Sequence, residues 1–102
     1  MTGPAPHPSW CDLSRCGVVA GRPTGTHCSH VVRLGPHPPG IVVAEVSLAQ
    51  GAPVRGYPRS GRPYVALALG EADSELCLAP LGIDLARELG RVLVGFARKV
   101  DG

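Results

Sequence analysis

Potential metal ligands gather near the start of the chain. Residues 10–30 hold three of the four cysteines and two of the four histidines. Structural zinc takes four tetrahedral ligands from thiolate and imidazole groups, usually as two closely spaced pairs. Cys11 and Cys16, with four residues between them, suit the first pair. Residues 10–30 therefore predict a metal-binding knuckle, with zinc as the expected ion.

The second pair of ligands must come from His27, Cys28 and His30. His27 with His30 suits a turn-like backbone, whereas Cys28 and His30, two positions apart, share one face of an extended strand. Spacing leaves both pairings open and leans slightly to Cys28 with His30, because a strand is expected to begin here. His7 is a weaker candidate, since residues 1–9 are Pro-rich and are expected to form a flexible tail.

A metal ion would also stabilise a chain whose own core is thin. Of its 102 residues, 14 are Gly and 11 are Pro, so loops take much of the length. Each well-buried Val or Leu contributes about 1.5 to 3 kcal/mol, while ordering one residue costs about 1 to 2 kcal/mol of backbone entropy. We therefore expect a single small domain, residues 10–102, in which metal binding and folding are coupled.

Apolar and polar residues alternate in the middle of the chain, as in half-buried strands. One strand is expected to place Val42, Ala44, Val46 and Leu48 on one face, and a later strand Val65, Leu67 and Leu69. Residues 50–62 form a long loop between them. We predict three or four antiparallel strands within residues 31–79.

The C-terminal part of the chain predicts an amphipathic helix over residues 80–100. Its apolar residues recur at spacings of three and four: Leu81, Leu85, Leu89, Val92, Leu93, Phe96 and Val100. Pro80 suits the first turn, where its missing N–H costs nothing. Ile83 and Val94 widen the apolar stripe, so we expect contact with a second surface as well as the sheet; a homodimer stays open. The predicted fold class is α+β: a small antiparallel sheet, a helix packed on one face and an N-terminal metal-binding knuckle.

The loop before the later strand suggests a second class of function. Arg55, Arg59 and Arg62 lie near Tyr57, and such a combination can grip phosphates and stack bases. A net charge of +2 does not favour nucleic-acid binding. The chain carries neither an H-E-x-x-H motif nor the zinc motif of deaminases, so we expect no enzyme activity.

The N-terminal residues lack the features of a targeting segment. They have no basic and apolar regions typical of a secretory signal, and no apolar run approaches the ~18 residues that a membrane span needs. We therefore expect a cytoplasmic protein without membrane contact. Thiols stay reduced in the cytoplasm, which favours metal binding over disulfides.

The residues of the knuckle resemble those of a family of short uncharacterised actinobacterial proteins. Its members begin with Pro-x-Trp-Cys, followed by a cysteine or histidine and then by Gly-x-His. The matching residues here are Pro8, Trp10, Cys11, Cys16, Gly25 and His27. The C-terminal helix is also similar to theirs. The resemblance implies that His27 is a ligand, and it implies no established activity.

Spacing and resemblance together predict the ligands Cys11, Cys16, His27 and His30, with Cys28 as the alternative. The predicted function is a small zinc-stabilised, non-enzymatic protein-interaction module that acts as a regulator. The alternative is a nucleic-acid-binding regulator that uses the arginine loop, defined by Arg55, Tyr57, Arg59 and Arg62.

Overall fold

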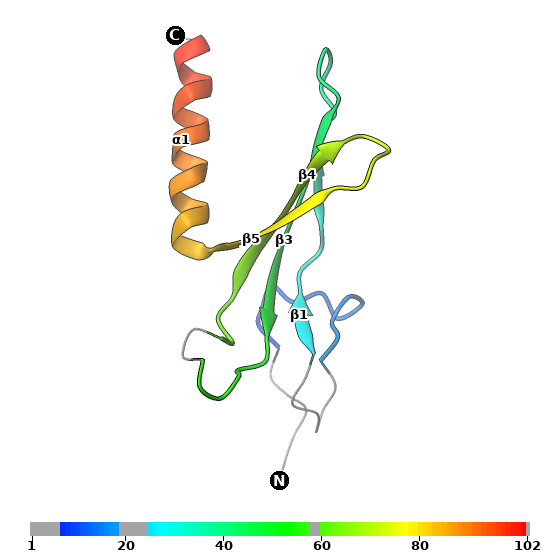
Figure 1. Ribbon diagram of the computed structural model, residues 1–102, viewed down its shortest axis with the longest axis vertical. Coiled ribbons are helices and arrows are strands. Elements are labelled where there is room, and N and C mark those ends of the chain that lie inside the picture. The colour runs from blue at the N-terminus through cyan, green and yellow to red at the C-terminus, as the bar shows by residue number, and fades with distance from the viewer. Residues whose placement is uncertain (1–6, 19–24, 58–59, 102) are drawn as a thin grey trace.

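The computed structural model describes residues 7–18, 25–57 and 60–101. In these parts the chain order is β1 (Thr26–Cys28), β2 (Val32–Leu34), β3 (Val42–Gly51), β4 (Tyr64–Glu71), β5 (Cys77–Gly82) and α1 (Ile83–Asp101). The strands form one antiparallel sheet in the order β1-β3-β4-β5, and β2 pairs with β3 along the same edge as β1 (Figure 1). The predicted α+β class is confirmed, because a small antiparallel sheet is followed by one C-terminal helix.

The paired strands present one continuous apolar surface. Val46 of β3 lies opposite Leu67 of β4, and Val32 of β2 lies opposite Val46 on the other edge. Directly opposed residues of antiparallel strands point to the same side of the sheet. The register therefore defines an apolar sheet face made of Val32, Leu34, Ala44, Val46, Leu48, Val65, Leu67, Leu69, Cys77, Ala79 and Leu81. The face predicted from the alternation of residues 42–48 and 65–69 is confirmed.

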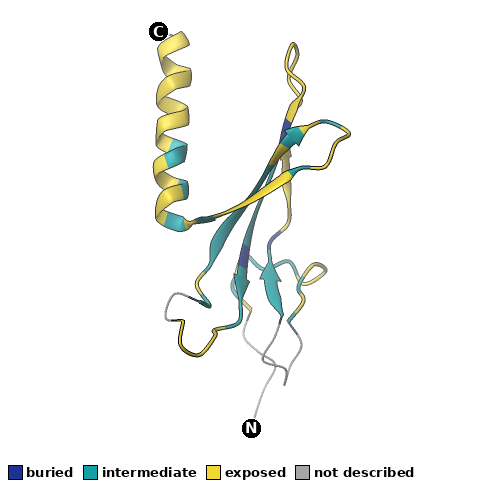
Figure 2. Cartoon of the chain, viewed as in Figure 1, coloured by how far each residue is buried: buried dark blue, intermediate teal, exposed yellow. Residues whose placement is uncertain are grey.

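The two buried hydrophobic residues of the described chain lie on the opposite side of β3. Val43 is 1% exposed and Ala49 is 5% exposed, whereas no residue of the apolar sheet face is buried (Figure 2). Val43 pairs with Gly70, and a Cβ atom at Gly70 would lie 2.8 Å from Cδ2 of Leu76. The missing side chain at Gly70 thus leaves the space that Leu76 fills. The core is as thin as the composition predicts.

A β-bulge separates β1 from β2. Cys28 pairs with Ala49 and Val32 pairs with Val46, so residues 29–31 stand opposite only two residues of β3. Ser29, the buried polar residue of the described chain, joins the bulge to β3. Its backbone N–H donates to the Leu48 carbonyl at 2.9 Å, and its hydroxyl accepts the Leu48 N–H at 2.7 Å. The side chain therefore replaces a ladder hydrogen bond that the extra residue removes.

The helix begins three residues later than predicted, because Pro80 belongs to β5. Pro80 pairs with Ala66 of β4. Strand β5 has a neighbour on one side only, and an edge strand tolerates a residue that has no N–H to donate. The prediction of a helix over residues 80–100 is therefore corrected to Ile83–Asp101.

The prediction that the helix packs across one face of the sheet is wrong. Figure 1 shows α1 standing beside the sheet and joined to it at the end of β5. None of its described residues is buried, and every residue from Arg91 to Asp101 is exposed (Figure 2). The physical reason is the connection: β5 ends at Gly82 and α1 begins at Ile83, so no loop lets the chain reverse over the sheet. Within the described residues, no helix has the length and hydropathy needed to span a bilayer.

Candidate metal centre

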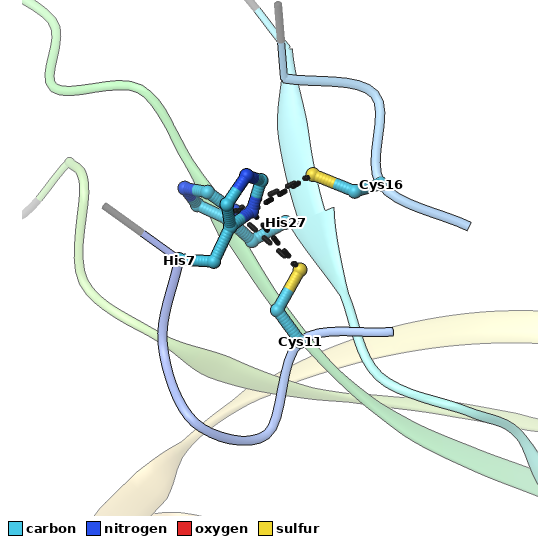
Figure 3. A group of neighbouring side chains, drawn as sticks. All are labelled: His7, Cys11, Cys16 and His27. Carbon is cyan, nitrogen blue, oxygen red and sulfur yellow. Dashed lines mark hydrogen bonds between the residues drawn. The ribbon is translucent and has the colours of Figure 1, made fainter. Parts of the chain in front are cut away.

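Four side chains that could ligate a metal converge beside β1. They are His7, Cys11, Cys16 and His27, and one ligand atom from each lies within 4.8 Å of all the others. Figure 3 shows the two sulfur atoms and the two imidazole rings pointing toward one another. His27 comes from β1, whereas the other three come from the segment that precedes the strand. The group is therefore assembled from both ends of the knuckle.

Backbone hydrogen bonds hold the knuckle against β1. The Cys11 N–H donates to the Pro8 carbonyl at 3.0 Å, which forms a turn that brings His7 back toward Cys11. On the strand side, the Asp12 N–H donates to the Cys28 carbonyl at 2.8 Å. The Gly17 N–H donates to the Thr26 carbonyl at 2.9 Å, directly after Cys16. The two carbonyls of β1 flank His27, so the thiols and this imidazole share one rigid frame.

The distances within the group match those of a tetrahedral zinc site. Zinc–nitrogen bonds of ~2.0–2.1 Å and zinc–sulfur bonds of ~2.3 Å, at tetrahedral angles, separate two nitrogens by ~3.3 Å and a nitrogen from a sulfur by ~3.6 Å. The Nδ1 atoms of His7 and His27 are 3.2 Å apart. The four nitrogen–sulfur separations lie between 3.5 and 3.6 Å. These five distances thus match five of the six edges of the tetrahedron that zinc prefers.

Hydrogen bonding alone cannot explain this convergence. Nδ1 of His7 contacts Nδ1 of His27 and the sulfur atoms of Cys11 and Cys16. Nδ1 of His27 makes the same three contacts in return. A neutral imidazole nitrogen has one hydrogen or one lone pair in the ring plane, so it makes one hydrogen bond rather than three. A shared ion at the centre satisfies all four atoms at once.

A cation would also ease the ionisation of the two neighbouring thiols. Partial burial raises the pKa of the Cys11 thiol, and the adjacent Cys16 side chain raises it further. The Val18 N–H lies 3.4 Å from Sγ of Cys16 and is oriented to donate to a thiolate. A divalent metal ion reverses the unfavourable pairing of two thiolates, because a coordinating thiol is deprotonated. Cys11 and Cys16 are both free thiols, so both sulfur atoms can ligate.

Two of the ligands considered from the sequence do not join the group. Cys28 directly follows His27 in β1, and neighbouring strand residues point to opposite faces. Its Sγ instead approaches the Thr26 carbonyl at 3.8 Å. His30 is exposed and lies in the bulge, which breaks the strand alternation on which the pairing of Cys28 with His30 relied. The structure thus brings together Cys11, Cys16 and His27 and places neither His30 nor Cys28 beside them.

His7, which was expected to lie in a flexible tail, is the fourth member of the group. The sequence did contain a signal, because His7 precedes Cys11 by four residues and Cys11 precedes Cys16 by five. Both are short ligand spacings of the kind found in structural zinc sites. Residues 1–6 of the expected tail lie outside the described residues, whereas residues 7–9 are described and contribute to the knuckle.

A cleft opens between the metal centre and the sheet. Its volume is about 520 Å³, and its wall includes Trp10 and Cys11 from the knuckle and Val46, Leu48 and Val65 from the apolar sheet face. Trp10 is half-buried here. The knuckle therefore shields one end of the apolar sheet face and leaves the rest of this face open.

The described residues of the other candidate sites are mostly exposed. In the arginine loop, Arg55, Tyr57 and Arg62 are exposed, and Arg59 lies outside the described residues. The partner-interface candidates both lie on α1, where Ile83 is half-buried and Val94 is 49% exposed. The exposed apolar surface of α1 extends well beyond these two residues.

Gly25 permits the close approach of the two halves of the knuckle. Its φ is +115°, and a Cβ atom would lie 2.9 Å from Cα of Val18 and would also contact the Gly17 carbonyl. We expect Gly25→Ala to lower the zinc affinity at least about 10-fold, because backbone strain of ~1–2 kcal/mol and the displacement of Gly17 both move Cys16. A competition titration with a chromogenic chelator measures this change.

Gly56→Ala is the matched control for that substitution. Gly56 also has a positive φ, +87°, but nothing lies within 4 Å of its added Cβ atom. The control therefore introduces the same kind of backbone strain, outside the knuckle and without a clash. Equal zinc affinities for the two variants would contradict the role assigned to Gly25.

Comparisons of the chain with models of protein families, with curated proteins and with solved structures returned no match. The resemblance of the N-terminal residues to the actinobacterial family stays a prediction. The function of the candidate site is therefore inferred from the site's own residues.

Proposed function

We propose that this chain is a small zinc-stabilised, non-enzymatic module that acts in the cytoplasm by binding another protein. The observation that carries the proposal is the set of nitrogen–nitrogen and nitrogen–sulfur distances among the four ligands. Two thiolates and two imidazoles form a ligand set typical of structural zinc. A reducing compartment keeps both thiols available.

A shell of four protein ligands supports a structural role for the metal. Catalytic zinc usually keeps three protein ligands and an open position for water. The carboxylate next to the site, Asp12, accepts hydrogen bonds from the Ser14 N–H at 3.0 Å and the Ser14 hydroxyl at 2.7 Å. These bonds lower the pKa of Asp12 and stabilise it as a carboxylate acceptor. Asp12 thus fits a turn-forming role better than that of a general base.

The binding role is supported by the C-terminal half of α1. Leu93, Phe96 and Val100 recur at spacings of three and four, and their exposed fractions are 60%, 61% and 87%. Apolar surface of this extent on a helix marks a site of interaction with another protein. In this proposal the metal centre holds the sheet in shape, and the helix supplies contact surface.

Substitution of cobalt(II) for zinc tests the closed ligand shell. We expect one cobalt ion per chain and a visible spectrum typical of tetrahedral coordination by two sulfurs and two nitrogens, because the protein supplies all four ligands. Azide, which occupies an open position, should leave this spectrum unchanged. A spectrum that shifts with azide would indicate an open site and would favour a metal-dependent enzyme.

The nucleic-acid alternative stays a prediction. Among the described residues, neither Arg55 nor Arg62 lies within ion-pair distance of an acidic side chain. Their guanidinium groups are thus available to phosphates, but the described loop does not gather them around a common site. We favour protein binding because the apolar surface of α1 is more extensive than this basic surface.

A further inference from the structure

We infer that the protein that covers α1 is a second copy of this chain, in a two-fold dimer in which each helix lies on the partner's apolar sheet face. This inference rests on the proposed function, since it names the partner of the interaction module. It follows from the apolar sheet face, the exposed helix, the connection between them and the size of the exposed surface.

A single chain leaves two apolar surfaces uncovered. Stable domains pack at least two layers of secondary structure around a core, yet only Val43 and Ala49 are buried hydrophobic residues in the described chain. On the apolar sheet face, Leu34 is 52% exposed and Leu69 is 45% exposed. On α1, Phe96 is 61% exposed. The sheet lacks a covering helix, and the helix lacks a sheet.

The connection between β5 and α1 favours exchange between chains. No residue separates Gly82 from Ile83, so the helix continues away from the sheet instead of folding back over the apolar sheet face. The helix of 19 residues is ~28 Å long, and the ten residues of β3 span about 33 Å. A partner helix therefore has the length to cover this face. Exchange of an identical element is a common route to symmetric dimers.

The exposed area exceeds what such a dimer needs. The chain exposes 8,020 Å², about 2,600 Å² more than the ~5,400 Å² expected for a folded monomer of 10.5 kDa. A stable interface of standard size buries about 800 Å² per partner. One third of this excess, about 870 Å², already meets that size. A net charge of +2 means that two copies repel each other only weakly.

Residue chemistry also selects an apolar occupant. The apolar sheet face carries no charged side chain, and Glu71, at the end of β4, borders it. The apolar stripe of α1 contains no charged residue: Arg87 and Arg91 lie on its other side, and Lys99 borders it, with its Nζ 5.1 Å from the centre of the Phe96 ring. Both surfaces are apolar, and a two-fold axis lets the same helix–sheet contact form twice.

Native mass spectrometry and light scattering of the zinc-loaded full chain test the dimer. We expect about twice the chain mass of 10.5 kDa, with one zinc ion per chain. Phe96→Glu on the helix and Leu69→Glu on the sheet should each raise the dimer dissociation constant at least about 100-fold, because either places a charge in an apolar interface. Arg91→Glu, on the polar side of α1, is the matched control and should remain dimeric.

Mixing the two disruptive variants tests the exchange itself. In a heterodimer, the intact helix of the Leu69→Glu chain meets the intact sheet of the Phe96→Glu chain, so one native contact returns. We expect heterodimers at concentrations where each variant alone is monomeric. A dimer built helix against helix gives no such rescue and would overturn the exchange. Zinc content and circular dichroism show that each variant is folded.

Further outcomes separate this inference from the proposed function. A wild-type monomer at high concentration that keeps its zinc would overturn the dimer and leave the zinc module standing. A dimer without bound zinc would overturn the zinc centre and keep the exchange. A zinc-bound monomer that captures a different protein, and loses it in Phe96→Glu, would show that the partner is not a second copy.

Discussion

Cys11→Ser is expected to abolish zinc binding and to remove cooperative thermal unfolding. Structural zinc contributes an apparent ~10 to 16 kcal/mol to the folding of small zinc-binding peptides, whereas a whole domain is stable by only about 5 to 15 kcal/mol. Two buried hydrophobic residues in the described chain, Val43 and Ala49, cannot make up such a loss. Native mass spectrometry reports the metal, and circular dichroism during heating reports the unfolding transition.

Matched substitutions show whether that loss is specific to the ligands. Cys28→Ser removes a thiol that lies outside the candidate centre, so this variant should keep one zinc ion and a wild-type transition. His7→Ala should lower the zinc affinity by orders of magnitude, because it opens the shell, and His30→Ala should leave it unchanged. Loss of zinc in His30→Ala together with full binding in His7→Ala would contradict the geometry and favour the ligand set predicted from the sequence.

The ligand set shows how far local sequence reasoning reaches. Residue type and short spacing selected Cys11 and Cys16, and the resemblance selected His27; the structure places all three together. The fourth position depends on the turn between Pro8 and Cys11, which brings His7 toward the sulfur atoms. A Pro-rich stretch without periodicity gives no sign of such a turn. The convergence of His7 with Cys11, Cys16 and His27 becomes visible only once the turn is formed.

The bulge explains why His30 does not join the group. Alternation is a reliable guide within a regular strand, and it correctly grouped Val42, Ala44, Val46 and Leu48 on one face. One extra residue reverses the faces for everything beyond it. Residues 29–31 contain that extra residue, so His30 does not continue the pattern of β1. The buried Ser29 hydroxyl that stabilises the bulge has no signature in hydrophobic periodicity.

The position of the helix relative to the sheet could not be predicted from the sequence. Periodicity predicted its type and its apolar stripe, and the structure confirms a helix over most of the expected range. Periodicity does not say which surface the stripe will cover. That choice depends on the connection after Gly82, where strand passes directly into helix. The sequence led us to expect that the helix packs on the sheet of its own chain. In our proposal it packs on the sheet of a second copy.

Val43→Asn is expected to lower the free energy of unfolding by about 4 kcal/mol. The substitution removes ~1.5 to 3 kcal/mol of apolar burial and places an amide where it costs at least ~1 to 3 kcal/mol without a hydrogen-bond partner. Val43 is 1% exposed, and it is the largest fully buried side chain of the described chain. Urea titration followed by circular dichroism, at one fixed protein concentration, measures the change.

Val42→Asn, one residue earlier in β3, is the matched control. Val42 is 58% exposed, so the same change in side chain and in strand propensity should cost less than about 1 kcal/mol. Asn is used instead of Asp because Val42 lies opposite Glu71, where a second carboxylate would add repulsion. The difference between the two variants isolates burial from strand propensity. Equal losses would mean that the contact between Val43, Gly70 and Leu76 does not form the stabilising core of the sheet.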